Sequence, residues 1–433
     1  MLENAGRIGF FGLGVSNTSL MGLDRFRGCK ITLRSDGKID RSVIPRGLNI
    51  ERIFEGADAA RDINEDLLFF SPSVRRERAE FAEARERGVK FSSDCELFFD
   101  ENPAPVFAVT GSDGKSTTAS ILHLLLKQAG TDNLLIGNIG EGMAVNLGLA
   151  KAYVCELSSF MLTYLAPKVT RACITNITPN HLNWHSSLEE YRAAKMRLAQ
   201  NAEECVLTDG LRVKNPYGIV SLERPLNELM RDYSAEVYYT AKDGYICRNG
   251  EMFVAISDIR IKEKHNILNF MTALATADGY ISKSDAAEVA RSFKGLPHRC
   301  QLIAKADEIE YYDSSIDSTP ARTAATLTAL GKEVVVILGG RSKGLDYSIM
   351  RDSLSKYAAR VVITGENSHE IYSAIKELNP VIIDDFEDAV LKGAELARGV
   401  GVLLLSPAST SYDRFKNYAE RGDKFKEIIL KNL

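Results

Sequence analysis

Short apolar runs alternate with amphipathic segments along the whole chain. The runs lie at 7–11, 30–33, 67–70, 106–110, 334–338, 361–364, 381–384 and 402–405. Each has the length of one buried strand, and the segments between them have helical spacing. This alternation predicts an α/β fold with parallel sheets. In the Tyr-rich segment 233–256, Asp-Gly and Asn-Gly turns predict hairpins instead.

Two breaks in the pattern divide the chain into three predicted domains. A polar linker with two prolines occupies 99–105, and a Gly-Leu-Pro turn occupies 295–297. A length of 433 residues also favours about three domains. We therefore expect a Rossmann-like domain over 1–99, a central domain over 100–296 and a second Rossmann-like domain over 297–433.

Composition narrows the class of protein. Hydrophobic residues make up 45% of the chain and charged residues 26%, which is ordinary for a globular protein. Lys and Arg total 54 against 58 Asp and Glu, so the chain has no overall basic charge to attract nucleic acid. The seven cysteines are scattered, as in reduced cytosolic proteins, and the apolar runs are too short to span a bilayer. We expect a cytoplasmic monomer with neither nucleic-acid nor membrane partners.

The first predicted strand leads into a glycine-containing turn. Gly12 and Gly14 match the start of a G-x-G-x-x-G dinucleotide fingerprint, but position 17, which needs the third glycine, is Asn17. A mononucleotide-like α/β domain without a nicotinamide cofactor is therefore favoured, and a dehydrogenase is disfavoured.

A phosphate-binding loop begins the central domain. The apolar run 106–110 leads into Gly111, Ser112, Asp113, Gly114, Lys115, Ser116 and Thr117, which open an amphipathic helix. Glycines let backbone N–H groups approach a polyphosphate, Lys115 adds a positive charge, and Ser116 can bind Mg²⁺. The loop departs from G-x-x-x-x-G-K-S only at Val109.

Other polar residues are less distinctive by themselves. Glu156 ends an apolar run, and His181 follows another, where α/β sheets place ligands and metals. The pattern around Lys195 is that of a solvated lysine on a helix face, and Asn266 and Asn269 could simply cap or decorate a helix.

Together these segments resemble the Mur ligase family, the ATP-dependent amino-acid ligases of peptidoglycan synthesis. The loop reads T-G-x-x-G-K-S-T, and further blocks follow in the family's order at 137–140 (GNIG), 156–160 (ELSSF), 176–181 (NITPNH), 191–195 (YRAAK), 265–269 (HNILN), 295–299 (GLPHR), 339–343 (GGRSK), 406–415 (SPASTSYDRF) and 421–422 (RG). The resemblance is greatest to the members that add D-glutamate to UDP-N-acetylmuramoyl-L-alanine through an acyl phosphate. It implies that the first domain binds the UDP-sugar, the central P-loop domain ATP, and the third the amino acid.

The resemblance also implies roles for individual residues. The implied catalytic residues are Lys115, His181, Lys195 and Arg299. ATP would contact the loop together with Asn266, Asn269, Arg299 and Asp313. Two Mg²⁺ ions would be held by Ser116, Glu156, His181 and Lys195, with Lys195 carbamylated by CO₂.

The two substrates have implied residues of their own. The UDP-linked substrate would be held in the regions 13–18, 34–35 and 71–72, through Gly14, Ser16, Ser71 and, from the central domain, Asn138. D-Glutamate would be held by Lys343, Ser411 and Tyr418.

One segment departs from the family's pattern. Where many D-glutamate-adding members read D-S-K-A-T-N from position 313, this chain has Ser315 and Asp317 in place of Lys and Thr. Asp317 would put an anion near the expected site of an anionic substrate. Two alternatives stay open. One is another amino-acid ligase of the family, including the folylpolyglutamate type, although the full N-terminal α/β section argues against that type. The other, from a different class, is a P-loop NTPase switch.

Overall fold

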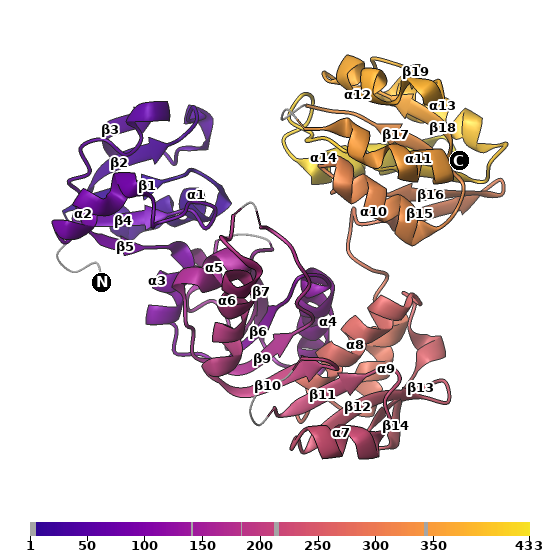
Figure 1. The fold of residues 1–433 in the computed structure, drawn as a ribbon, viewed down its shortest axis with the longest axis horizontal. Helices are drawn as coiled ribbons and strands as arrows, with labels where there is room; N and C mark the ends of the chain where they lie inside the picture. The colour runs from indigo at the N-terminus through magenta and orange to yellow at the C-terminus, as the bar shows by residue number, and fades with distance from the viewer. Residues whose placement is uncertain (1–5, 140–141, 183, 212–215, 342–344) are drawn as a thin grey trace. The chain divides into compact units, whose positions relative to one another are not determined.

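A computed structural model describes residues 6–139, 142–182, 184–211, 216–341 and 345–433. The described residues form three β-sheets and two compact units, Met1–Phe293 and Lys294–Leu433. Two sheets belong to the first unit and one to the second (Figure 1). Helices connect the parallel strands, which confirms the predicted α/β fold. The three-domain boundaries after 99 and 296 stay a prediction.

The first sheet is parallel throughout, with strand order β3-β2-β1-β4-β5. Its strands are β1 (Arg7–Phe11), β2 (Lys30–Ser35), β3 (Asn49–Glu55), β4 (Leu67–Phe70) and β5 (Lys90–Ser92), and its helices are α1 (Val15–Met21), α2 (Ala82–Glu86) and α3 (Asp94–Glu101). The apolar runs that predicted strands in this part of the chain correspond to β1, β2 and β4.

Side chains of neighbouring positions in β1 and β4 pack on opposite faces of this sheet, because side chains alternate along a strand. Phe10 stacks on Phe69 at 5.5 Å between ring centroids, on the face that also buries Leu20 of α1. Phe11 stacks on Phe70 at 5.8 Å on the opposite face. The sheet is thus buried on both sides, as expected for parallel strands.

The central sheet has strand order β14-β13-β12-β11-β10-β9-β6-β8-β7. Its strands are β6 (Val106–Thr110), β7 (Asn133–Gly137), β8 (Ala152–Glu156), β9 (Val169–Ile174), β10 (Ala202–Thr208), β11 (Gly218–Ser221), β12 (Val237–Lys242), β13 (Tyr245–Arg248) and β14 (Glu251–Ala255). Pairing is parallel from β7 to β12, and β13 and β14 continue the sheet as antiparallel strands. The hairpins predicted within 233–256 are therefore confirmed.

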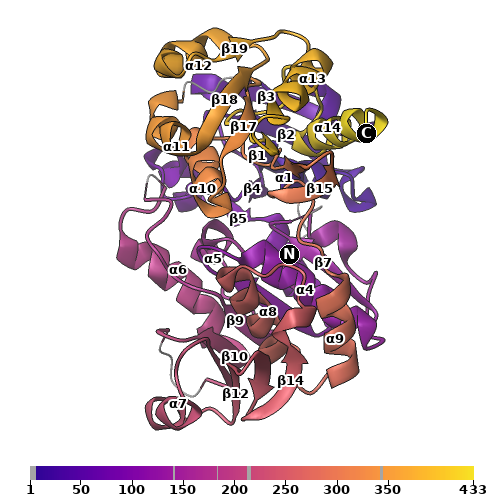
Figure 2. The ribbon, with the colours of Figure 1, turned by 90° about the vertical axis from the view of Figure 1, so that its right-hand side faces the viewer.

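Helices cover both faces of the central sheet (Figures 1 and 2). They are α4 (Lys115–Gln128), α5 (Ser159–Tyr164), α6 (Leu188–Gln200), α7 (Leu226–Asp232), α8 (Lys264–Thr276) and α9 (Lys283–Ser292). Helix α4 packs against α8 and α9, whereas α5 packs against α6. Ala108 and Cys155 of the sheet share a core with Leu162 of α5 and Leu198 of α6.

The sheet of the second unit has strand order β15-β16-β20-β17-β18-β19, parallel except between β15 and β16. Its strands are β15 (Gln301–Ala306), β16 (Ile309–Asp313), β17 (Val334–Leu338), β18 (Ala358–Ile363), β19 (Val381–Ile382) and β20 (Val402–Leu405). Its helices are α10 (Pro320–Leu330), α11 (Arg351–Tyr357), α12 (Ser368–Ile375), α13 (Phe386–Ala397) and α14 (Tyr418–Lys431). Helices α13 and α14 share one apolar core with this sheet, and α10, α11 and α12 share another.

Most residues singled out from the sequence lie near the carboxyl ends of parallel strands. The loop 111–114 follows β6, Glu156 ends β8, and Asp313 ends β16. Such ends are where open α/β sheets bind ligands. None of the described helices has both the length and the apolar run that a bilayer crossing needs.

Candidate active site

The loop between β6 and α4 has a backbone that only glycine fits at two positions. Gly111 has φ +150° and Gly114 has φ +77°. A Cβ at position 111 would lie 1.9 Å from Thr175 Oγ1, and one at position 114 would lie 2.2 Å from Asn269 Oδ1. Side chains are therefore excluded on steric grounds as well as by the positive φ angles.

Residues that follow β9 hold the same loop from outside. Ser112 N donates to Asn176 O at 2.9 Å, and Asp113 N donates to Asn176 Oδ1 at 2.9 Å. Thr175 Oγ1 donates to Asp113 O at 2.6 Å. Ser112 Oγ also lies 2.8 Å from the hydroxyl of Tyr191 in α6. The loop is therefore fixed by hydrogen bonds before any ligand binds.

Glu156 is fully buried at the end of β8, beside this loop's strand. One carboxylate oxygen, Oε1, accepts a hydrogen bond from Asn138 Nδ2 at 2.9 Å. The other oxygen, Oε2, is buried and has no hydrogen-bond partner among the residues that the structure describes. Because an unpartnered buried carboxylate oxygen is costly, it is a strong indication that a cation or donor binds there.

Lys195 is buried rather than solvated, which overturns the interpretation that its helical spacing alone favoured. Its side chain extends from α6 to the phosphate loop, where Nζ donates to Gly111 O at 2.6 Å. Burial, aided by the positive charge of Lys115, lowers the pKa of Lys195 to about 7. A large fraction of this amine is therefore neutral, and nucleophilic, at neutral pH.

Two histidines follow β9, and only one was singled out from the sequence. His181 is exposed, has φ +54°, and its ring forms a T-shaped contact with the ring of Phe160, with 5.0 Å between centroids. His185 is buried, and its Nε2 lies 3.0 Å from Ser159 Oγ. Its Nδ1 has no hydrogen-bond partner in the described part of the chain. Burial lowers the pKa of His185 to about 4, so it is neutral near pH 7.

The phosphate loop has a second wall in α8. Asn269 is buried against Gly114, and Thr118 Oγ1 donates to Asn269 Oδ1 at 3.4 Å. Asn269 Nδ2 donates to Asn266 Oδ1, also at 3.4 Å. Asn266 Nδ2 in turn donates to Glu263 Oε2 at 2.9 Å. The asparagines expected near a nucleotide thus lie beside the loop, and helix capping does not account for Asn269.

In the first sheet, Ser71 lies against the turn after β1, because a Cβ on Gly12 would come within 2.9 Å of Ser71 Cβ. Gly14 is exposed and Ser16 half-buried at the start of α1. Asn17, at the position of the missing third glycine, is fully buried. Its Nδ2 donates to Gly12 O at 2.8 Å and to Phe11 O at 3.1 Å. The side-chain amide of Asn17 therefore stabilises this turn by hydrogen bonds to its backbone.

Arg34 lies in a region expected to hold the UDP group, yet its side chain is not available to a ligand. It is fully buried and ion-paired with Glu65 at 2.8 Å. Its guanidinium also donates to the carbonyl oxygens of Ala59, Arg61 and Asp62. The side chain therefore holds the 59–62 segment in place.

In the second unit, Asp313 is buried and its carboxylate is already engaged. Oδ2 lies 2.7 Å from His298 Nδ1, and Oδ1 accepts from Ser315 N at 2.8 Å. The hydrogen bond to Asp313 raises the pKa of His298. A Cβ on Gly422 of α14 would lie 2.2 Å from His298 Nδ1, so the helix packs directly on this pair.

The remaining predicted residues of this unit differ in exposure. Arg299 is exposed just before β15, and Tyr418 is 43% exposed at the start of α14. Ser411 is buried in the segment after β20. Lys343 lies outside the residues that the structure describes.

The two residues that depart from the family pattern are both buried inside this unit. Asp317 Oδ2 accepts hydrogen bonds from Thr326 Oγ1 and Ser406 Oγ, both at 2.8 Å. Ser315 accepts from buried Arg421 through Oγ at 3.0 Å and through its carbonyl at 2.9 Å. The carboxylate of Asp317 therefore joins α10 to the end of β20.

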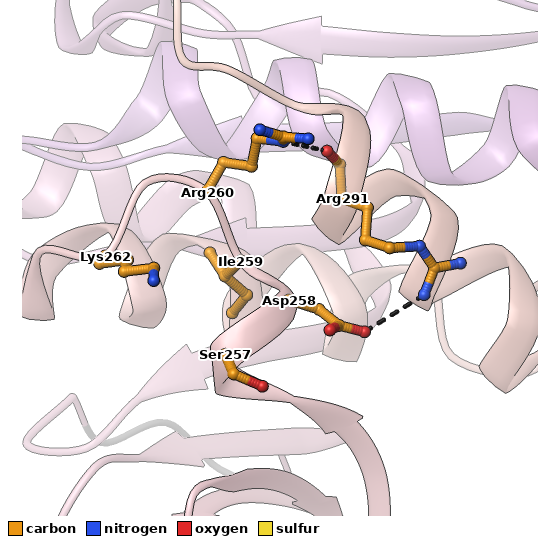
Figure 3. Close-up of a pocket in the computed structure, with 6 residues that line it drawn as sticks. All are labelled: Ser257, Asp258, Ile259, Arg260, Lys262 and Arg291. Carbon is orange, nitrogen blue, oxygen red and sulfur yellow. Dashed lines mark hydrogen bonds and ion pairs between the residues drawn. The ribbon is translucent and has the colours of Figure 1, made fainter.

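A separate surface depression of about 330 Å³ lies between the end of β14 and α9 (Figure 3). It is lined by Ser257, Asp258, Ile259, Arg260, Lys262 and Arg291. Arg291 pairs with Asp258 at 3.2 Å, and Arg260 Nε donates to Arg291 O. None of the predicted site residues that the structure describes lines this depression.

In the first unit, the structure brings the loop, Glu156, Lys195 and Asn269 together at one end of the central sheet. Residues that the sequence did not single out hold them there, above all Thr175, Asn176 and Tyr191. Asn176 and Tyr191 lie within the resembling blocks 176–181 and 191–195, which was the only available signal. Local spacing gave no reason to select them.

A parallel α/β sheet ending in a tightly held phosphate loop, with a buried carboxylate and lysine beside it, defines a class of phosphate-loop proteins. Comparison with known families agrees. The model of the Mur ligase middle domain matches residues 109–277, and that of the Mur ligase glutamate ligase domain matches residues 298–409. The chain belongs to the Mur ligase family.

Curated relatives match over nearly the full length. UDP-N-acetylmuramoylalanine--D-glutamate ligase of Ruminiclostridium cellulolyticum is 31% identical over 460 residues, and that of Clostridium botulinum strain Loch Maree is 31% identical over 447. Each match covers 98% of this chain and 96% of the relative.

Solved structures share the fold. UDP-N-acetylmuramate-alanine ligase MurC from Thermotoga maritima has a TM-score of 0.59 at 18% identity, covering 99% of this chain and 100% of that one. MurF from Acinetobacter baumannii has a TM-score of 0.51 at 15% identity, covering 97% and 93%. At these identities the likeness concerns the fold alone.

The His298–Asp313 pair predicts a pH-dependent stability. Because the folded state raises the pKa of His298, the stabilisation is fully present below the unfolded value of about 6.5 and is lost as pH rises through the folded value. We expect His298→Gln to lower the free energy of unfolding by about 1–3 kcal/mol below pH 6.5, and by less at pH 9. Thermal unfolding at both pH values measures this. His369→Gln, at an exposed histidine of the same unit, is the control; an equal loss at both pH values for His298→Gln would contradict the prediction.

Proposed function

We propose that this protein is an ATP-dependent ligase that joins D-glutamate to UDP-N-acetylmuramoyl-L-alanine in the cytoplasmic synthesis of peptidoglycan precursors. The observation that carries the proposal is the packed loop at Gly111–Gly114, together with the buried oxygen of Glu156 that has no hydrogen-bond partner within the described ranges. Full-length similarity to ligases named for this reaction supports the choice of substrates. The protein acts as a monomer.

ATP and Mg²⁺ fit the residues present. The first turn of α4, which follows the loop, offers backbone N–H groups to the phosphates, Lys115 adds its charge, and Asn266 and Asn269 lie beside the loop. Among the described residues, no three His, Cys, Asp or Glu side chains form a ready-made metal cluster. The predicted ligands Ser116, Glu156, His181 and Lys195 include one carboxylate and one imidazole, so phosphate oxygens would complete the coordination. Mg²⁺, when bound, neutralises phosphate charge during transfer.

The reaction has two steps. A carboxylate oxygen of the alanyl group attacks the γ-phosphorus of ATP; the bond to the β–γ bridging oxygen breaks, and an acyl phosphate and ADP form. The amine of D-glutamate then attacks the acyl carbon, the C–O bond to phosphate breaks, and the amine loses a proton. Lys115 and Arg299 stabilise charge on the transferred group, since positioning and electrostatics are what a protein contributes to phosphoryl transfer.

Each substrate has its own proposed residues. Gly14, Ser16 and Ser71 of the first sheet, together with Asn138, hold the UDP-linked substrate. D-Glutamate is held by Ser411, Tyr418 and Lys343. Asp313, whose carboxylate is hydrogen-bonded to His298, helps to position the nucleotide. The buried hydrogen bonds of Asp317 support this acceptor, because they keep that carboxylate away from an anionic ligand.

Phosphate release tests the proposal directly. The protein is incubated with ATP, Mg²⁺ and UDP-N-acetylmuramoyl-L-alanine, and amino acids are added one at a time. We expect release that depends on D-glutamate. Release that depends on another amino acid would retain a ligase but refute this acceptor, and release without either substrate would favour an NTPase switch.

Steric exclusion at position 114 predicts the effect of one methyl group. Gly114→Ala would place a Cβ on Asn269, and we expect ATP affinity to fall by roughly a hundredfold, equivalent to about 2.7 kcal/mol. Gly130→Ala is the matched control, because Gly130 follows the other end of α4 with φ +83° and open space around it. It should lose about 1 kcal/mol of stability and keep its affinity. Calorimetric titration with ATP distinguishes the two variants; equal affinities would refute the assignment of the loop.

The low pKa of Lys195 predicts that this residue reacts with CO₂. We propose that the neutral amine adds to CO₂ and releases a proton, which converts a cation into an anionic oxygen ligand. Activity should fall when CO₂ is removed and return with bicarbonate. Enzyme from which CO₂ has been removed should be carbamylated faster as pH rises through about 7, because the fraction of Lys195 that is neutral increases.

Variants of α6 test the same point. Lys195→Ala should be inactive with or without bicarbonate, and short carboxylates should restore part of the activity. Arg192→Ala, an exposed position on the same helix, should respond to bicarbonate as the wild type does. A fully active Lys195→Ala would exclude the carbamate.

A further inference from the structure

Trp184, the only tryptophan in the chain, connects the first sheet to the central sheet. Its indole Nε1 donates to Ser73 O at 2.8 Å, in the loop that follows β4 and contains Ser71. Arg75 returns the contact: Nη1 donates to Trp184 O at 2.9 Å, and the guanidinium lies 4.7 Å from the indole centroid. Arg75 also pairs with Glu190 of α6 at 2.9 Å.

The same indole packs on a residue of α5 that also contacts the ring of His181. Trp184 stacks on Phe160 with 4.3 Å between centroids and 24° between planes. Phe160 is the aromatic residue whose ring meets His181. Trp184 therefore forms a hydrogen bond to the loop after β4 and also packs on Phe160, which contacts the predicted catalytic residue His181.

A second series of contacts leads from Trp184 to the phosphate loop. The indole lies 4.7 Å from the ring of His185, which lies 5.2 Å from the ring of Tyr191. The hydroxyl of Tyr191 is hydrogen-bonded to the hydroxyl of Ser112 in the phosphate loop. All these contacts lie within the first unit, and each is a ring packing or a hydrogen bond.

We propose that Trp184 and Arg75 form a clamp that positions the Ser71–Ser73 loop relative to His181 and the phosphate loop. The inference rests on the proposed function, in which the first sheet holds one end of the substrate and the other end reacts at the phosphate loop. Trp184 is a positioning residue, because it acts through Ser73, Phe160 and His185. The group essential to this role is the indole N–H of Trp184, which donates to Ser73 O.

The clamp matters because the two ends of one substrate are held by different sheets. A junction that shifts by about 1 Å moves the reacting carboxylate out of line with the phosphorus, which can cost up to about a hundredfold in rate. In the proposed function ATP binds the loop together with Asn266, Asn269 and Arg299, and none of these residues takes part in the contacts of Trp184 and Arg75 given above. Loosening the clamp should therefore lower kcat and leave the KM for ATP unchanged.

Trp184→Phe tests this, because phenylalanine keeps a ring for Phe160 to stack on but cannot donate to Ser73 O. Tyr164→Phe is the matched control: it removes the hydroxyl that accepts from Arg76 N at 3.0 Å, a contact between the same two sheets. We expect kcat to fall about tenfold in Trp184→Phe, with an unchanged KM for ATP. Tyr164→Phe should lose about as much thermal stability as Trp184→Phe does, but its kcat should stay within about twofold of the wild-type value.

Two results would overturn the clamp. One is wild-type kcat in Trp184→Phe; the other is an equal loss of kcat in Tyr164→Phe, which would make the contact ordinary docking between sheets. If Trp184→Phe does not fold, Arg75→Lys replaces it, since lysine keeps the charge near Glu190 but not the planar contact with the indole. The same two results for Arg75→Lys would count against the clamp.

A fluorescence measurement separates this inference from the proposed function. As the sole tryptophan, Trp184 should change its emission when UDP-N-acetylmuramoyl-L-alanine is added without ATP. Calorimetric binding with no emission change, together with full activity of Trp184→Phe, would refute the clamp and leave the proposed function intact. Absence of both binding and ligation would refute the proposed function, and the clamp's role with it.

Discussion

Thr175 Oγ1 and Asn269 Oδ1 occupy the space that side chains at positions 111 and 114 would need. The phosphate loop is consequently held between the end of β9 and the first turns of α8, and its conformation is set by the sheet rather than by a ligand. Neighbouring elements place Glu156 and Lys195, because β8 lies beside β6 and α6 packs against β6 and β9. A displacement of α8 would therefore alter the loop itself.

Features encoded in contiguous residues could be predicted from the sequence. The strands β1, β4, β6, β17 and β20 match apolar runs, and the phosphate loop is recognisable because its residues are consecutive. Burial of Lys195 was not predictable from spacing, since the helix face it occupies becomes interior only when Gly111, 84 residues away, packs over it. The same holds for Asp317, whose partner Ser406 is 89 residues distant.

Buried cations in this protein rely heavily on carbonyl oxygens. Lys195 donates to one carbonyl, Arg421 to those of Ser315 and Ser409, and Arg34 to three in addition to Glu65. Carbonyl oxygens satisfy the donors but neutralise less charge than a carboxylate does, so burial dominates the titration. The pKa of Arg421 is accordingly lowered to about 10. For arginine this changes nothing at neutral pH, whereas for Lys195 it changes the chemistry available.

Each sheet is built from its own stretch of chain: β1 to β5, then β6 to β14, then β15 to β20. No strand is exchanged between sheets in the described part of the chain, so each can form in turn as the polypeptide leaves the ribosome. Some contacts of the first sheet nevertheless come from residues of the central sheet's part of the chain, which is synthesised later. Its anchor at Asp94, which accepts N–H groups of Met143 and Ala144, and its bond from Trp184 both need later residues. A chain synthesised only as far as the first sheet would therefore expose to solvent the surface that later contacts the central sheet.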